Sequence, residues 1–363
     1  MTLSRTSTAA PDARAAVDVL AAGRGIGWRP GRWFLAVLVL GLALLAGVLI
    51  GPAGLTPAGV FQEFANAIPG INIESGLTAQ QQAILWRIRV PRVILGAIVG
   101  ATLAVSGAAY QGVFRNPLAD PYLLGVSSGA GLGATLAIAN GGTIGPIGVP
   151  LAAFAGGLVA VAATYALGAT VGGGRTATVI VLAGVAVAAF FSAVQTYVQQ
   201  RFDDSLLAVY SWMLGQLSTN GWSDVIAVAP WVAVSWLVLL LHRRTLDVLA
   251  VGDVEATSLG INVGRVRLLL VLTATLGTTA VVAVSGLIGF VGIVVPHAIR
   301  LIFGTSYRML LPMTMLLGGA FLVLADVVAR SAVSPAELPI GVVTAFIGAP
   351  FFLVVLRRSR SVS

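Results

Sequence analysis

The chain has 363 residues, of which 58% are hydrophobic and only 9% are charged. Too few charged side chains remain to cover a water-soluble domain, so the composition excludes an ordinary soluble enzyme and indicates a membrane protein. The formal net charge of +8 comes from 21 arginines without a single lysine, and cysteine is absent. The arginines stand singly between apolar runs, which favours loop topology signals over a basic patch, and we expect no nucleic-acid partner.

Ten apolar stretches are long enough, or nearly so, for membrane helices, which need about 20 residues each. We predict an all-α polytopic fold with about ten transmembrane helices, at residues 33–50, 93–110, 123–139, 150–171, 179–198, 224–241, 268–284, 286–303, 310–328 and 340–356. An amphipathic stretch at 206–217 is too short to span. Residues 1–32 read as a cytoplasmic tail before a retained first helix, 33–356 as the transmembrane domain and 357–363 as a second cytoplasmic tail.

The arginine distribution gives the orientation of these helices. Ten crossings from a cytoplasmic amino terminus return the carboxyl terminus to the cytoplasm. Sixteen arginines then lie inside and five outside, as the positive-inside rule requires, and the outer five are Arg87, Arg89, Arg92, Arg201 and Arg330.

Small residues recur at spacings that predict close helix packing in lipid. Glycines four residues apart occur at 96 and 100, 125 and 129, and 168 and 172. The sequence Ala-Val-Ser-Gly also occurs twice, at 104–107 and 283–286, each time with a proline ten residues after its glycine. These copies would start from opposite faces, as in an inverted repeat, although coincidence in so Ala- and Val-rich a chain explains them equally well.

No residue pattern predicts catalysis or a metal site. A chain without lysine cannot carry the GxxxxGK phosphate-binding loop, so ATP hydrolysis would have to come from a partner. An ion-coupled transporter would need ionisable residues deep in the membrane. Only Asp326, His297 and Arg300 come near this requirement, and Asp326 could simply pair with Arg330 four residues later.

Several long motifs in a fixed order resemble the FecCD family, the permeases of bacterial ABC importers for iron-siderophore, haem and vitamin B12 uptake. These motifs lie at 89–92, 115–121, 124–131, 252–260, 289–297, 325–330 and 337–341. The resemblance implies a ten-helix permease of the inner membrane that pairs with a second copy or a paralogous permease. It also implies two cytoplasmic ATPase subunits, which would hold ATP and magnesium, and a periplasmic or lipid-anchored binding protein. No cofactor is implied for this chain itself.

The resemblance assigns expected roles to particular residues. Arg89, Arg92 and Arg330 would dock an acidic binding protein, with lipid headgroup anchoring as the alternative. In a coupling region at 246–262, contact with the ATPase would involve Gly252, Asp253, Glu255, Ala256, Leu259 and Gly260, although an ordinary capped connector would show the same pattern. A cytoplasmic gate would involve Asn116, Pro117, Leu118, Ala177 and Thr178.

Two further residues suit an anionic cargo more weakly. Tyr197 and Arg201 would lie where the fifth helix reaches the outer face, although Arg201 could instead pair with Asp203 or Asp204. The leading hypothesis is an ATP-driven importer of an iron chelate, most simply a ferric siderophore. Haem or cobalamin import is the alternative within the family, and ion-coupled secondary transport is the alternative outside it.

Overall fold

The computed structural model describes residues 30–51, 53–141, 147–170, 177–217, 221–333 and 336–360. Every regular element within these ranges is a helix. Among the described residues, seven helices are long and apolar enough to cross a membrane: α2 (Pro30–Leu49), the continuous helix Ala79–Phe114, α7 (Gly148–Thr170), α8 (Ala177–Arg201), α10 (Trp222–Leu241), α13 (Val263–Ser285) and α15 (Tyr307–Ser331). Three further helices have shorter apolar segments: α6 (Val126–Ala139), α14 (Val291–Phe303) and the part Ile340–Val355 of α16 (Ile340–Arg360).

These helices correspond one to one to the predicted spans, and the prediction of an all-α multi-pass membrane protein is confirmed. The continuous helix consists of α4 (Ala79–Ile84), a π turn η1 (Leu85–Arg89) and α5 (Val90–Phe114). Short elements join the spans: α3 (Pro57–Asn66), η2 (Pro121–Leu124), η4 (Asp203–Ser205), α9 (Leu206–Met213), α11 (Arg243–Val251) and α12 (Asp253–Ser258). The predicted tails fall mostly outside the described residues, although 30–32 already belong to α2 and 357–360 to α16.

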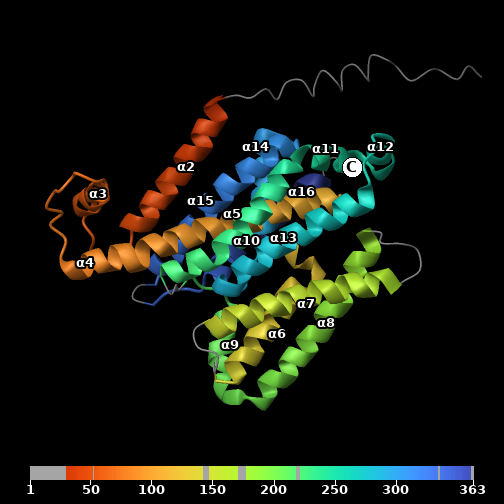
Figure 1. The fold of residues 1–363 in the computed structure, drawn as a ribbon, viewed down its shortest axis with the longest axis horizontal. Coiled ribbons are helices and arrows are strands. Elements are labelled where there is room, and N and C mark those ends of the chain that lie inside the picture. The colour runs from red at the N-terminus through yellow and green to blue at the C-terminus, as the bar shows by residue number, and fades with distance from the viewer. Residues whose placement is uncertain are drawn as a thin grey trace, which may run out of the picture.

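The bundle has two distinct ends, as Figure 1 shows. Helices α3 and α4 lie at one end, whereas α11, α12 and the carboxyl end of the chain lie at the opposite end. Helix α5 runs through the middle and packs against α10, α13, α14 and α15, while α6, α7 and α8 form a second group that contacts α13. The opposite positions of α4 and α12 agree with the predicted topology, which puts the start of α5 outside and the turn after α11 inside.

Glycines bring neighbouring backbones into direct contact around α5. A Cβ atom on Gly100 would lie 2.2 Å from the carbonyl oxygen of Gly318 on α15, and one on Gly107 would lie 2.1 Å from that of Gly292 on α14. Gly129 meets Gly156 of α7 equally closely, at 2.3 Å. Lipid gives little hydrophobic drive for helix association, so close backbone packing must supply much of it. The predicted role of small residues is confirmed at these positions.

The helix expected at 286–303 begins only at Val291. Residues Gly286–Phe290 form a non-helical segment in which Gly286 has φ +67° and Phe290 has φ +68°. The hydroxyl of Tyr122 holds this segment, because it donates to the Ile288 carbonyl and accepts from the Ile288 amide, both at 3.2 Å. The Ala-Val-Ser-Gly copies thus differ, since the first continues within α5 and the second ends α13.

The glycine contacts lead to a paired test of packing. We expect Gly100→Ala to lower the free energy of unfolding by roughly 1–3 kcal/mol, because the added methyl group overpacks the backbone of α15. Gly41→Ala is the matched control, since Gly41 is also helical but a Cβ there meets nothing within 4 Å. Thermal unfolding in detergent would compare the two variants. Equal stability of both would contradict the packing role of Gly100.

Candidate functional site

An ion-pair cluster lies at the start of α5, the end that the predicted topology puts outside, and there Arg92 binds two carboxylates at once. Its Nε and Nη2 donate to Oδ1 of Asp326 on α15, at 3.1 and 2.8 Å. Its Nη1 and Nη2 donate to the two carboxylate oxygens of Glu337, also at 3.1 and 2.8 Å. Asp326 is in addition 3.2 Å from Nε of Arg330, one helical turn later. Bidentate geometry of this kind is strong and specific for guanidinium and carboxylate groups.

Arg89 and Arg330 point into the protein, where they are only 5% and 4% exposed. Arg89 donates through Nη1 to the carbonyls of Val48 at 2.6 Å and Leu49 at 3.2 Å, and Arg330 donates through Nη2 to the carbonyl of Gly47. These carbonyls end α2, where helical partners are lacking and the helix dipole is negative. Both arginines therefore anchor α2 to the bundle.

Of the three arginines expected to dock a binding protein, Arg89 and Arg330 are thus buried. The arginine distribution indicates the side of the membrane on which a residue lies, but it carries no information about the direction of the side chain. Arg92 keeps 14% of its side chain exposed, and its partner Glu337 keeps 47%. Within the cluster, the Arg92–Glu337 contact is thus the one that a partner protein can reach.

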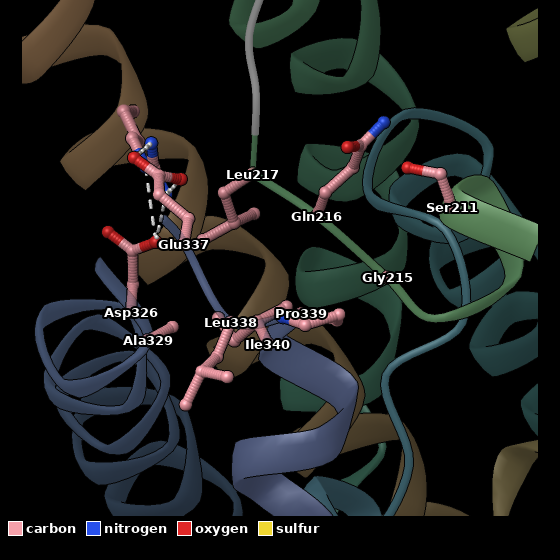
Figure 2. A pocket seen from close by; sticks show the side chains of 11 residues that line it. Ser211, Gly215, Gln216, Leu217, Asp326, Ala329, Glu337, Leu338, Pro339 and Ile340 are labelled. Atoms are coloured by element: carbon pink, nitrogen blue, oxygen red, sulfur yellow. Dashed lines mark hydrogen bonds and ion pairs between the residues drawn. The ribbon is translucent and has the colours of Figure 1, made fainter. Parts of the chain in front are cut away.

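A cavity of about 120 Å³ opens beside this contact, as Figure 2 shows. Its wall includes Arg92, Asp326 and Glu337, together with the polar side chains of Ser211 and Gln216. The ion pairs of the cluster join two guanidinium groups, those of Arg92 and Arg330, to two carboxylates, so their charges balance. A carboxylate of another protein could therefore bind Arg92 only by replacing Glu337, because Asp326 is buried.

The turn predicted to contact the ATPase lies at the opposite end of the bundle, in α11 and α12. Gly260 has φ +79° and ends α12 in a Schellman motif, in which its amide donates to the Thr257 carbonyl at 2.9 Å and the Ile261 amide to the Ala256 carbonyl at 3.0 Å. Gly252 is extended, and the Glu255 carboxylate occupies the space beside it. Ala256 is fully buried, so α12 is seated on the protein by one face.

Asp253, at the start of α12, is bound within the chain. Its carboxylate oxygens accept from Nη2 of Arg267 at 3.0 and 3.1 Å, and Oδ1 lies 3.3 Å from Nη2 of Arg115. The Asp253 interaction therefore ties α12 to α13 and to the end of α5. Sequence reasoning missed Arg115 and Arg267, because the turn carries no signal that points to either of them.

Polar and apolar side chains are both exposed in this turn: Glu255, Thr257 and Ser258 are exposed, and so are three large apolar residues. Val251 is 71% exposed, Val254 is 79% exposed and Leu259 is 69% exposed. Singly exposed apolar residues are common, but three within nine residues form a local apolar surface. The exposure of Leu259 is compatible with its predicted role. Asp253, in contrast, already pairs with Arg267 and Arg115 within the chain.

The predicted gate segment at 116–118 directly follows Arg115, which pairs with Asp253 of this turn. Arg115 ends α5 with φ +49°, and Oδ1 of Asn116 then accepts from the Leu118 amide at 2.9 Å. Asn116, Pro117 and Leu118 are exposed. The second predicted gate pair, Ala177 and Thr178, forms the first turn of α8, and the side chain of Ala177 lies outside the described residues.

The residues predicted to meet an anionic cargo, Tyr197 and Arg201, lie at the outer end of α8. Tyr197 is 68% exposed and Arg201 is also exposed. The described side chains include no ion-pair partner for Arg201, but the side chain of Asp203 lies outside them. Both residues are thus open to a ligand or partner, and the Asp203 alternative stays untested.

Asp120 follows the gate segment and caps η2 by accepting from the Tyr122 amide at 2.8 Å. Burial disfavours its charged form and raises the pKa of Asp120 to about 6. A carboxyl whose pKa is raised in the folded state contributes stability below about pH 4 and loses that contribution as the pH rises through about 6.

We therefore expect Asp120→Asn to be more stable than the wild type at pH 8, by roughly 1–3 kcal/mol, and similar to it at pH 4. The amide oxygen of asparagine can still accept from the Tyr122 backbone amide, but asparagine carries no charge at any pH. Unfolding midpoints of both proteins between pH 4 and 8 would measure the difference, and subtraction cancels all other titrating groups. A difference that stays constant with pH would contradict the perturbed carboxyl.

Comparisons with known proteins agree with this geometry. The family model of the FecCD transport family matches residues 37–358. The cobalamin import system permease protein BtuC of Halobacterium salinarum is 46% identical over 285 residues, which cover 78% of this chain and 76% of that protein. The hemin transport system permease protein HmuU of Yersinia pestis is 41% identical over 282 residues, or 76% and 84% of the two chains.

A solved structure of a metal-chelate type ABC transporter in an inward-facing conformation has the same fold. It is 30% identical, superposes with a TM-score of 0.79, and the match covers 91% of this chain and 100% of that one. The sequence motifs, the helical architecture and these relatives agree. The chain belongs to the FecCD transport family of ABC importer permeases.

Proposed function

We propose that this chain is the membrane subunit through which an ATP-driven importer moves an iron chelate, most simply a ferric siderophore, into the cytoplasm. The observation that carries the proposal is the family match over nearly the whole chain, from residue 37 to 358. Permeases of hemin, iron(3+)-hydroxamate and Fe(3+)-citrate import systems are among the relatives. The 46% identity to a cobalamin import permease favours cobalamin as the second candidate cargo.

ATP enters this proposal only through partner subunits. Two ATPases would hold ATP and magnesium, because the chain lacks the lysine of a phosphate-binding loop, and no cofactor is assigned to the chain itself. The exposed apolar side chains of Val251, Val254 and Leu259 support contact with such a partner. The permease would work as a homodimer, or with a paralogous permease, in a bacterial inner membrane with both termini in the cytoplasm.

Ion-coupled transport receives less support from the interior of the bundle. Asp326 is bound to Arg92 and Arg330, while Arg300 donates to the side chains of Gln111 and Tyr307. The ring of His297 packs edge-on against Phe351. Proton or sodium coupling would require one of these groups to change partners during transport.

The outer cluster supports docking of a binding protein, either periplasmic or lipid-anchored. We assign the contact itself to Arg92, while Arg89 and Arg330 shape the surface by anchoring α2. Asn116, Pro117 and Leu118, with Ala177 and Thr178, remain the proposed cytoplasmic gate. Tyr197 and Arg201, exposed at the outer end of α8, remain the proposed contacts for an anionic chelate.

The contact with the ATPase can be tested at two neighbouring residues. Leu259→Ala should weaken assembly by about 2–5 kcal/mol if the side chain is buried in the partner, whereas Glu255→Ala should cost about 1 kcal/mol or less. Co-purification of the ATPase with each variant measures the effect. Leu207→Ala is the control, since Leu207 is 88% exposed on α9, away from the turn. Wild-type retention of the ATPase by Leu259→Ala would show that the turn is only a connector.

Docking can be tested by removing the internal competitor for Arg92. Glu337→Gln should lower the Kd for the binding protein by roughly two- to fivefold, because an exposed ion pair contributes about 1 kcal/mol or less. Arg92→Ala should raise that Kd. Glu74→Gln removes an exposed acid from the outer loop without touching the cluster and serves as the control. Unchanged binding in both cluster variants would remove Arg92 from the docking surface.

A further inference from the structure

Asp247 lies on α11 but caps a different helix. Its Oδ1 accepts from the Tyr307 amide at 2.6 Å, and its Oδ2 accepts from the Ser306 hydroxyl at 3.1 Å. The side chain of Ser306, the N-cap residue of α15, forms no capping hydrogen bond to the backbone of its own helix. The first amides of a helix need acceptors, and a negative charge there is favourable. The start of α15 therefore depends on a carboxylate that comes from the segment leading to the coupling turn.

Helix α11 is well placed to transmit force between the coupling turn and the bundle. Leu246 and Leu249 on its inner face are buried, at 0% and 2% exposure, and the helix packs against α5 and α15. Gly252 alone separates α11 from α12, and the exposed apolar residues lie at the end of α11 (Val251), on α12 (Val254) and directly after it (Leu259). A partner that displaces α12 would therefore also move α11. Through the Asp247 cap, the start of α15 would move with α11.

Helix α15 extends from this cap to the outer cluster. Its 25 residues span about 37 Å at 1.5 Å per residue. Asp326 and Arg330, near its carboxyl end, belong to the cluster that binds Arg92. Along its length the helix is in backbone contact with α5 at Gly318, which leaves little room for bending. The helix is continuous although it contains Pro312, and it connects the two surfaces that the proposed function assigns to partners.

We infer that Asp247 is a positioning residue for signal transmission. It binds the coupling segment to α15, so that docking of the binding protein at the outer cluster stimulates ATP hydrolysis by the ATPase. This inference rests on the proposed function, because both partners are assigned there. Coupling between two distant sites requires an element whose position both sites influence. Helix α15 is linked to both, through Asp247 at its start and through its own Asp326 near its end.

The test uses the full complex of permease, ATPase and binding protein in lipid nanodiscs. In Asp247→Ala, we expect ATPase co-purification, basal ATP hydrolysis and the Kd of the binding protein to stay within about twofold of wild type. The stimulation of hydrolysis by loaded binding protein should fall by about fivefold or more, the lower end of ordinary allosteric coupling. Asp247→Asn should retain part of the stimulation, because its amide oxygen can still accept from Tyr307.

Asn262→Ala is the matched control for the loss of a helix cap. Oδ1 of Asn262 accepts from the Arg265 amide at 3.1 Å and caps α13. Asn262 is the N-cap residue of that same helix, so this cap does not join two helices as the Asp247 cap does. We expect this variant to keep its stimulation. Full stimulation in Asp247→Ala, or an equal loss in Asn262→Ala, would overturn the inference. A wild-type permease that neither retains the ATPase nor responds to the binding protein would instead contradict the proposed function.

Discussion

Direct backbone contact between α5 and its neighbours is the constraint on which the rest of the structure depends. In lipid, apolar side chains gain little by leaving their surroundings, so helices must fit closely to stay together. Gly100 and Gly107 allow α15 and α14 to approach to a distance that no side chain would tolerate. Because Arg92 lies in the first turn of α5 and Arg115 is its C-cap residue, this packing fixes the position of the outer cluster relative to the coupling turn.

Carboxylates organise both ends of the bundle. Asp326 holds Arg92 and Arg330 at the outer end, while Asp253 holds Arg115 and Arg267 at the inner end. With these charges paired within the chain, the surfaces left for partners are of two different kinds. The outer surface offers one arginine whose exposed partner can be exchanged, and the inner surface offers apolar side chains. This difference fits an acidic partner outside and a partner with an apolar cleft inside.

Much of the fold could be predicted from the sequence because a membrane limits the choices. The lengths of the apolar runs predict the membrane spans. The arginine distribution predicts a topology that agrees with the opposite positions of α4 and α12. The break before α14 could not be predicted, since residues 286–290 are as apolar as a helix and their partner, Tyr122, lies 166 residues from Ile288. The inward direction of Arg89 and Arg330 and the pairing of Asp253 with Arg267 likewise depend on tertiary contacts that a local pattern does not encode.

The most direct measurement is uptake into vesicles that contain this chain with its ATPase, with loaded binding protein outside and ATP inside. The cargo would be a labelled ferric siderophore, with labelled cobalamin and haem in parallel. The account predicts that uptake of one of these requires ATP hydrolysis and continues after ionophores collapse the proton and sodium gradients. Uptake that proceeds without ATP, or that stops when the gradients collapse, would contradict it.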